Sequence, residues 1–189
     1  MTPTPKNPRR KYLPACLPLG AFLVLVVLFA VPLLQGKDPS IIPSAMIGKP
    51  VPVFDLKPAL KNGKGFSDAD LKNAAQPAVV NVFASWCVSC RVEQQMLEKL
   101  RKESGMPLYG IDYKDESGAA EGWLKKYGNP FTAVGFDNSG RTGIDFGIYG
   151  VPETFIIDRK GFIRFRRVGP LSQDDLDNIL LPLLKELSK

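Results

Sequence analysis

Cys87 and Cys90 are separated by two residues and stand between an apolar run and a helical pattern. Residues 78–84 are mostly apolar and β-branched, which predicts a buried strand, and apolar residues recur at helical spacing over 92–100. Cys87 is therefore expected at the start of a helix, where free backbone N–H groups and the helix dipole favour a thiolate. Cys90 lies one turn further along. A pair so placed can attack a disulfide and then resolve the mixed disulfide.

Other cysteine chemistries fit the sequence less well. A zinc site needs four ligands, whereas the chain has three cysteines and no histidine, and Cys16 lies far upstream in an apolar segment. The lack of histidine also excludes Cys–His proteases and most hydrolytic triads. A purely structural disulfide stays open as an alternative, although a CxxC loop at a helix start favours redox activity. We therefore expect a redox-active cysteine pair, with no metal and no further cofactor.

The net charge of +6 is concentrated at the N-terminus. Residues 1–37 carry five basic residues and no acidic one, which leaves 20 of the 25 basic residues and all 19 acidic ones for the rest of the chain. The remainder is thus nearly neutral, and no surface that binds nucleic acid is expected. Arg164, Arg166 and Arg167 cluster on a predicted strand, where a solvated strand face is the favoured interpretation.

An uncharged stretch separates Lys11 from Lys37, and its centre, residues 17–34, is an apolar run of 18 residues. A helix of roughly 20 residues spans the hydrocarbon layer of a membrane, so we expect a single-pass transmembrane anchor there. The basic residues within 1–16 then mark a cytoplasmic tail. A cleaved signal peptide is the competing interpretation, but no clear small-x-small cleavage site follows the run.

The anchor organises the rest of the chain. Residues 35–48 are rich in proline, glycine and serine, which predicts an extended tether, and residues 49–189 are expected to form one compact domain. With the N-terminus in the cytoplasm, this domain faces the periplasmic, oxidising side of a bacterial inner membrane. Disulfides of other proteins persist there and are available as substrates of this domain.

The order of the elements predicted for this domain indicates an α/β fold. Helices connect the first three main strands, so these strands should be parallel, whereas the last two form an antiparallel hairpin. A central mixed sheet with helices on both faces follows, which is the layout of thioredoxin. Ser67 and Ser172 are expected to cap helices, and Pro182 to bend or interrupt the last one. The predicted strands cover residues 51–56, 78–84, 107–113, 131–136, 154–158 and 162–168.

Several stretches of this domain resemble a known family. Residues 81–93 resemble the active-site run of membrane-anchored thioredoxin-like proteins, and residues 111–115 resemble a segment of the CcmG/DsbE type. Residues 145–158 are similar to the stretch that precedes the final hairpin in that type. The glutamate after the proline in this stretch is the most specific feature, because generic thioredoxins lack it. With two short matches at 128–130 and 168–170, the resemblance covers most of residues 49–175.

This resemblance implies a thiol:disulfide interchange protein of c-type cytochrome maturation in a Gram-negative envelope. Proteins of this type keep the CxxCH cysteines of apocytochrome c reduced for haem attachment, directly or through a partner thiol protein. The expected partners are therefore apocytochrome c or such a thiol protein of cytochrome c maturation. A transmembrane electron donor is expected to restore the dithiol, because the oxidising compartment offers no glutathione buffer.

The resemblance and the pattern together assign roles to the residues around the cysteines. Cys87 is expected to be the exposed nucleophile with a low pKa, and Cys90 the shielded, resolving thiol. Trp86 is expected to cover the pair and line the groove for the partner, with an ordinary core position as the alternative. The resemblance implies a cis peptide bond before Pro152, which would leave the Val151 backbone opposite Cys87 and open to β-type pairing with a client.

The resemblance also implies acidic residues near the site that tune the thiol pKa values and the choice of partner. Glu93 lies one turn beyond Cys90, and Glu153 follows the proline and is expected to approach the same groove. A nearby carboxylate would raise a cysteine pKa, because it disfavours a second negative charge. A solvated helix position is the alternative for Glu93. For Glu153, an acid within an apolar strand favours a functional role.

Two positions depart from generic thioredoxins. Asn81 occupies the place of a buried aspartate that accepts the proton of the resolving thiol there, so a glutamate or water would have to act as the base here. Ser89 replaces a proline that is common between the cysteines, which leaves the redox potential open.

We therefore expect a membrane-tethered thiol-disulfide oxidoreductase that acts mainly as a reductant. One alternative is a related tethered reductase with another client in the envelope. The other is a non-enzymatic module that binds apocytochrome or haem and contains a structural disulfide. The absence of histidine, the usual haem ligand, disfavours that module.

Overall fold

The computed structural model describes residues 13–34 and 45–189. The chain divides into two units, one that contains α1 (Leu13–Leu34) and one that begins at Ser40, and each is described by itself. Much of the predicted cytoplasmic tail (1–16) and of the predicted tether (35–48) lies outside the described residues.

Helix α1 begins at Leu13, four residues before the start of the predicted anchor, and ends with it at Leu34. The early start is compatible with Pro14, because proline is tolerated in the first turn of a helix, where its missing N–H has no partner to lose. No helix within the described residues is both long and apolar enough to cross a membrane. The transmembrane anchor therefore stays a prediction.

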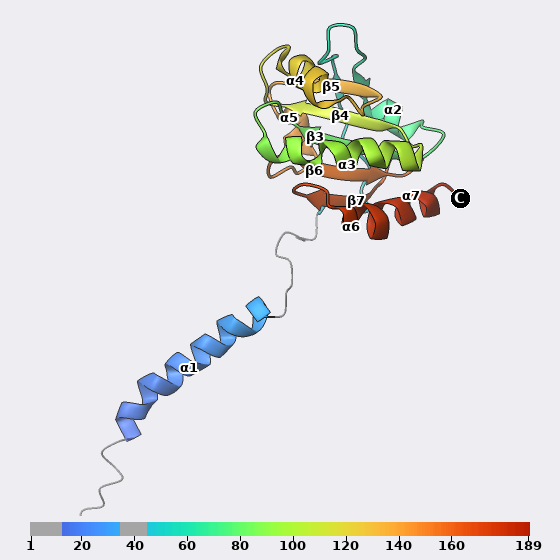
Figure 1. The fold of residues 1–189 in the computed structure, drawn as a ribbon. Helices are drawn as coiled ribbons and strands as arrows, with labels where there is room; N and C mark the ends of the chain where they lie inside the picture. The colour runs from blue at the N-terminus through green and yellow to red at the C-terminus, as the bar shows by residue number, and fades with distance from the viewer. Residues whose placement is uncertain (1–12, 35–44) are drawn as a thin grey trace, which may run out of the picture. The chain divides into compact units, whose positions relative to one another are not determined.

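The second unit is built on a five-stranded sheet with the order β5-β4-β3-β6-β7 (Figure 1). Strand β3 pairs in parallel with β4, and β4 with β5, whereas β6 is antiparallel to both β3 and β7. The predicted mixed sheet is thus confirmed. Its strands are β3 (Ala78–Phe83), β4 (Leu108–Tyr113), β5 (Ala133–Asp137), β6 (Glu153–Ile157) and β7 (Ile163–Val168).

Side chains alternate between two apolar layers, one on each face of the sheet. On what we call the α3 face, Val79 and Phe83 of β3 pack with α3 (Val88–Ser104), α4 (Ala119–Tyr127) and the C-terminal helix. On what we call the α5 face, Val80 and Val82 belong to a cluster with Leu71 and Phe146. Leu71 lies in α2 (Asp68–Lys72), and Phe146 directly follows α5 (Arg141–Asp145).

Two predicted elements differ from the structure. The first strand, expected over 51–56, is only Asp55–Leu56 (β1), paired with Phe66–Ser67 (β2). The backbone N–H of Val51 instead donates to Gly161. Helix α5 was not predicted, because five residues are too few to show an apolar period.

The C-terminal helix shows the predicted cap and the predicted interruption. The Ser172 hydroxyl accepts a hydrogen bond from the Asp175 backbone N–H, and the Asp175 carboxylate accepts one from the Ser172 N–H. The helix then runs through α6 (Gln173–Asp175), a π-helical segment η2 (Leu176–Leu180) and α7 (Leu181–Leu187). The π-helical segment ends two residues before Pro182, whose missing N–H cannot continue a regular ladder.

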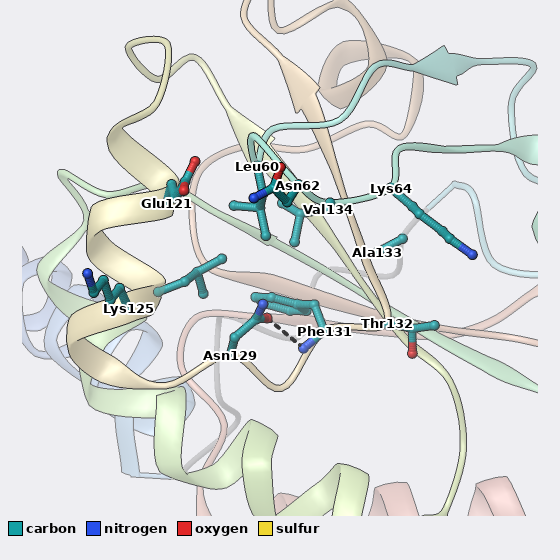
Figure 2. A pocket seen from close by; sticks show the side chains of 12 residues that line it. Leu60, Asn62, Lys64, Glu121, Lys125, Asn129, Phe131, Thr132, Ala133 and Val134 are labelled. Atoms are coloured by element: carbon teal, nitrogen blue, oxygen red, sulfur yellow. Dashed lines mark hydrogen bonds between the residues drawn. The ribbon is translucent and has the colours of Figure 1, made fainter.

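The outer strands of the sheet are hydrogen-bonded by loop segments. Beside β5, the Phe136 N–H donates to the Lys57 carbonyl and the Ala59 N–H to the Val134 carbonyl. At the start of β7, Ile163 exchanges hydrogen bonds with residues 48–49. A cavity of about 420 Å³ lies beside β5, between α4 and residues 60–64 (Figure 2). No cysteine lines it, so the redox chemistry lies elsewhere.

Candidate active site

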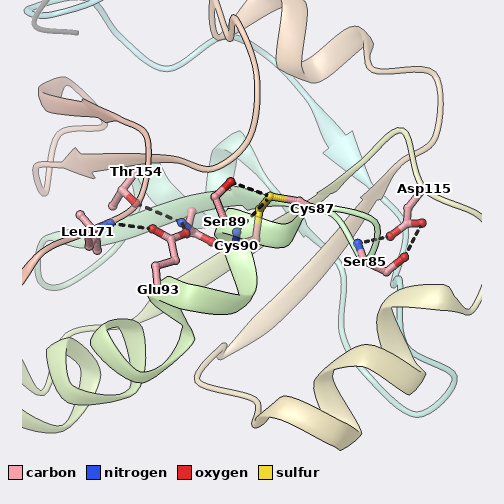
Figure 3. The surroundings of a disulfide bond; sticks show 9 residues. Ser85, Cys87, Ser89, Cys90, Glu93, Asp115, Thr154 and Leu171 are labelled. Atoms are coloured by element: carbon pink, nitrogen blue, oxygen red, sulfur yellow. Dashed lines mark hydrogen bonds between the residues drawn. A yellow bond between two sulfur atoms is a disulfide. The ribbon is translucent and has the colours of Figure 1, made fainter.

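Cys87 and Cys90 form a disulfide at the start of α3, with sulfur atoms 2.02 Å apart (Figure 3). Strand β3 ends four residues before Cys87, and Cys87 caps α3: its sulfur accepts a hydrogen bond of 3.0 Å from the Cys90 backbone N–H. The Ser89 hydroxyl lies 3.5 Å from the same sulfur. These donors and the positive end of the helix dipole are positioned to stabilise a thiolate at Cys87 once the disulfide is reduced.

The two cysteines differ in access to solvent, but less than expected. Cys87 is 6% exposed and Cys90 is 1% exposed. The expectation of an exposed Cys87 is therefore wrong for the disulfide form, because its sulfur is bonded to Cys90 and faces the helix terminus. Cys87 is still the more accessible residue of the two, in line with its predicted role as nucleophile.

Trp86 forms part of the surface beside the disulfide. It is 58% exposed, so the alternative of an ordinary core position is wrong. Its indole N–H donates to the Lys114 carbonyl at 3.2 Å, which fixes the ring beside the site. Val88 and Val92 are also exposed on α3. The cavity that includes Cys87 measures only about 100 Å³, so an apolar surface of this kind suits a protein client better than a small molecule.

Glu93 is buried on the α3 face, one turn beyond Cys90. Its carboxylate accepts hydrogen bonds from the Asn81 side-chain amide at 2.9 Å and from the Leu171 backbone N–H at 3.0 Å (Figure 3). Burial raises the pKa of Glu93 to about 7, and these two hydrogen bonds oppose the rise only in part. The alternative of a solvated helix position is therefore wrong.

Asn81 joins Glu93 to the sheet. Its amide nitrogen donates to the Glu93 carboxylate and to the Thr154 hydroxyl at 3.0 Å, while its carbonyl oxygen has no hydrogen-bond partner among the described residues. A half-turn of the amide would direct that oxygen at Glu93, where it can accept a hydrogen bond from the O–H of the protonated carboxyl group. Asn81 thus suits both protonation states of the carboxyl group next to it.

Glu153 lies on the other face of the sheet. It is the first residue of β6, and strand alternation places it with Phe155 on the α5 face, whereas Thr154 points to Asn81. Its carboxylate binds the Arg166 guanidinium at 2.7 Å and accepts hydrogen bonds from the Tyr149 and Gly150 N–H groups. The expectation that it approaches the groove of the thiols is thereby corrected. Its influence on the thiols stays a prediction.

The arginines of β7 also differ from expectation. The side chain of Arg166 is buried rather than solvated: it pairs with Glu153, donates to the Gly147 carbonyl at 2.9 Å and lies 4.5 Å from the centre of the Tyr149 ring. Arg164 binds Asp158 at 2.6 Å, and Arg167 lies 3.4 Å from Asp175. The expectation of a solvated strand face is therefore wrong for Arg166, because a carboxylate on the neighbouring strand compensates its charge.

The peptide bond between Val151 and Pro152 is cis, as predicted. The Pro152 carbonyl accepts a hydrogen bond from the Gly169 N–H at 2.9 Å. Val151 packs against the core cluster that contains both cysteines. Within the part of the chain that the structure describes, the Val151 backbone takes part in no hydrogen bond, so it is available to an extended client chain.

Known proteins are similar to this chain in sequence and in fold. Residues 47–166 match the AhpC/TSA family. The chain is 44% identical over 173 residues to the thiol:disulfide interchange protein DsbE of Pseudomonas aeruginosa. This match covers 90% of this chain and 92% of that protein. The chain is 43% identical over 155 residues to DsbE of Escherichia coli strain K12, with 82% and 83% covered. The chain is a DsbE-type member of the AhpC/TSA family.

The DsbE family also accounts for the fold. The crystal structure of a DsbE-type thiol:disulfide interchange protein from Chlorobium tepidum superimposes with a TM-score of 0.62 at 26% identity, over 77% of this chain and the whole of that one. The protein is therefore a thiol-disulfide oxidoreductase with a thioredoxin-like fold, and the reading as a non-enzymatic binding module is set aside.

Sequence reasoning missed one group of residues beside the disulfide. Asp115 accepts hydrogen bonds from both the backbone N–H and the hydroxyl of Ser85, two residues before Cys87 (Figure 3). Asp112 is buried nearby on β4. The sequence does contain a signal for Asp112, because an acid inside a predicted apolar strand needs a compensating contact, as it does for Glu153.

Proposed function

We propose that this thiol-disulfide oxidoreductase is a membrane-anchored reductant of the bacterial envelope. Its client would be apocytochrome c, or a thiol protein that serves the maturation of c-type cytochromes. The observation that carries the reductive direction is Glu93, a buried carboxyl group with no cation beside it in the described residues, one turn from Cys90. The relation to the DsbE proteins supports the choice of client.

The exchange runs in two balanced steps. The Cys87 thiolate attacks one sulfur of a client disulfide, so that a Cys87–client disulfide forms and the other client sulfur leaves as a thiolate. The Cys90 thiolate then attacks the Cys87 sulfur and releases the second client sulfur. The client gains two electrons and two protons, and the protein retains the Cys87–Cys90 disulfide that the structure contains. A transmembrane thiol donor would return the two electrons.

Glu93 would support the exchange in two ways, of which the first favours the reductive direction. When ionised, it disfavours a second negative charge nearby, and a less stable thiolate makes the dithiol a better reductant; DsbA is strongly oxidising because its reduced form is stabilised. With a pKa of about 7, Glu93 can also take the proton that Cys90 loses and release it again at neutral pH. It would thereby supply the base that Asn81 cannot.

Residues on the cis-proline side would select the client. The unpaired backbone of Val151 can add an extended peptide, and Trp86 offers an exposed ring next to Cys87. A reductant in an oxidising compartment has to discriminate among many disulfides, and a surface of defined shape supplies that discrimination.

The sequence supports the membrane location. Residues 17–34 are apolar and uncharged, and four basic residues precede them. We propose an inner-membrane anchor with a cytoplasmic N-terminus and a periplasmic catalytic domain. Protease added to spheroplasts should then digest residues 49–189; complete protection of that domain in intact spheroplasts would contradict the proposed orientation.

Cysteine variants test the exchange reaction. Cys87→Ser should abolish the reduction of insulin or of a disulfide-bonded CxxCH peptide, whereas Cys90→Ser should accumulate a covalent mixed disulfide through Cys87. The redox potential of the catalytic domain, measured against a dithiothreitol buffer, should lie closer to the value of about −270 mV of thioredoxin than to about −120 mV of DsbA. A potential near that of DsbA would reverse the proposed direction.

A cell experiment tests the client. Cells that lack the protein should lose covalently bound haem in c-type cytochromes, and added dithiothreitol should restore it, because it supplies the missing reduction. Cytochromes that form normally in its absence would point to another client in the envelope, without affecting the exchange chemistry.

A further inference from the structure

Asp112 is a buried carboxyl group that the exchange reaction does not use. It is 1% exposed at the end of β4, and neither carboxyl oxygen has a hydrogen bond from an N–H or O–H group among the described residues. Strand alternation places it with Leu108 and Gly110 on the α3 face, the face on which the disulfide lies. A buried, ionised carboxylate without a donor would be very unfavourable.

Asp115, three residues further on, is in the opposite situation. It accepts three hydrogen bonds: from the Ser85 backbone N–H at 2.6 Å, from the Ser85 hydroxyl at 2.8 Å and from the Glu116 N–H at 2.8 Å. Three donors satisfy a carboxylate in its ionised form. Ser85 lies in the loop between β3 and α3 that carries Trp86 and Cys87, so Asp115 holds that loop near its start.

We propose that Asp112 and Asp115 form an acid–carboxylate pair that positions the active-site loop. In this pair Asp112 is protonated and donates a hydrogen bond to the carboxylate of Asp115. This arrangement gives each group what it lacks: Asp112 needs an acceptor for its proton, and Asp115 has oxygen lone pairs left after its three donors. Burial, and then the charge of Asp115 and the hydrogen bond to it, raise the pKa of Asp112 to about 8.

The surroundings leave Asp115 as the ionised group that faces Asp112. Its register partners are Phe83 on β3 and Phe136 on β5, and neither is charged. The buried side chains of α4 are uncharged too, and the sulfurs at the start of α3 are joined in the disulfide. Lys114, between the two acids in sequence, places its ammonium group 5.1 Å from the Tyr113 ring centre.

The pair acts on the cysteines through the loop. Residues 85–87 have two attachments to the segment after β4: Ser85 to Asp115, and the Trp86 indole to the Lys114 carbonyl. Above about pH 8, loss of the proton from Asp112 would put two negative charges in contact, which weakens the hold on Ser85. Asp112 is thus a positioning residue. The proposal rests on disulfide exchange at Cys87 and Cys90 and is independent of the client.

The test uses the disulfide form of the protein, in which the cysteines do not titrate. The Trp86 indole N–H resonance, identified by its loss in Trp86→Phe, is followed by NMR from pH 5.5 to 9.5. It should shift with a midpoint near pH 8 in the unchanged protein. In Asp112→Asn the amide can still donate to Asp115 but cannot ionise, so this transition should disappear while the resonance keeps its low-pH position. Glu93→Gln, the matched control, should retain the transition.

A transition near pH 8 that persists in Asp112→Asn would overturn the proposal. If Asp112→Asn does not fold, infrared spectroscopy of Glu93→Gln decides instead, because Asp112 is unchanged in it. The carbonyl stretch of a neutral carboxylic acid should then be present at pH 7 and lost with a midpoint near pH 8. Absence of that band at pH 7 would show that Asp112 is ionised, and the proposed pair would not exist.

Discussion

The two faces of the sheet each bury one glutamate close to the active-site loops, and the two glutamates have opposite environments. On the α3 face, Glu93 has hydrogen-bond donors but no cation among the described residues. On the α5 face, Glu153 has an arginine at 2.7 Å and two backbone donors from the loop before the cis-proline. The carboxyl group of Glu93 has a pKa near neutrality, whereas that of Glu153 belongs to a buried ion pair.

The difference shows how burial alone does not decide what an acid does. An uncompensated carboxyl group responds to burial by keeping its proton, which makes Glu93 available for proton transfer. A compensated one can keep its charge and uses it to hold other groups in place. Here Glu153 holds Arg166 and the Tyr149–Gly150 segment, and through them the chain that leads into Pro152.

Removing the cation should give the largest effect. Arg166→Met leaves the charge of Glu153 buried without its partner, so the free energy of unfolding should fall by about 3–5 kcal/mol. Urea unfolding followed by circular dichroism measures it. Arg166→Met combined with Glu153→Gln removes both charges and should recover more than half of the loss. A single variant as stable as the unchanged protein would show that the pair contributes no compensation.

The pH dependence of stability should come next. The pKa of Glu93 is raised from 4.5 to about 7, so the folded state keeps a proton that the unfolded chain has already lost. The stabilisation is fully present below pH 4.5 and is lost as the pH rises through 7, an effect of about 3 kcal/mol. Urea unfolding between pH 4.5 and 8.5 should show this loss relative to Glu93→Gln. A constant difference between the two proteins across that range would contradict it.

Substitution of the exposed aromatic residues near the two faces should have a smaller effect, which is measured as the catalytic efficiency toward a client peptide. Trp86→Ala should lower kcat/KM for a disulfide-bonded client peptide about tenfold, because an exposed ring next to the nucleophile is a typical binding hot spot. Reaction with a small disulfide should be nearly unchanged. Tyr149→Ala is the matched control on the α5 side. It should lower kcat/KM less than Trp86→Ala does, since the Tyr149 ring also lies against Arg166. Equal losses in both variants would remove the distinction.

The smallest effect should appear in the reactivity of the reduced protein. The rate of alkylation by iodoacetamide, plotted against pH, should contain an inflection near pH 7 from the ionisation of Glu93, which changes the charge next to Cys90. Glu93→Gln should remove this inflection, and Glu153→Gln should retain it. The same inflection in both variants would mean that another group causes it.

Features that depend on neighbours in sequence were predicted well. The strand before Cys87, the helix after it and the cap at Ser172 follow from apolar spacing and from side chains three residues apart. The cis bond before Pro152 came from the resemblance, because a local pattern does not distinguish it from a trans bond.

Features that depend on distant residues were not predicted. The face on which Glu153 lies follows from the register of β6 against β3, in which Glu153 pairs with Val82, 71 residues away along the chain. The burial of Glu93 needs Leu171, and the burial of Arg166 needs the carboxylate on β6. These contacts form only when the sheet assembles, so local patterns in the sequence do not predict them.

The loop segments beside β5 and at the start of β7 have a consequence for self-association. An uncovered outer strand can recruit further chains, one after another, into a growing fibre. A protein that receives extended, incompletely folded polypeptides would meet this hazard at every encounter. Residues 57–59 and 48–49 are already hydrogen-bonded to the outer strands, so these edges are less open to a further chain. The client position that we propose at Val151 lies outside the outer strands, in the loop before β6.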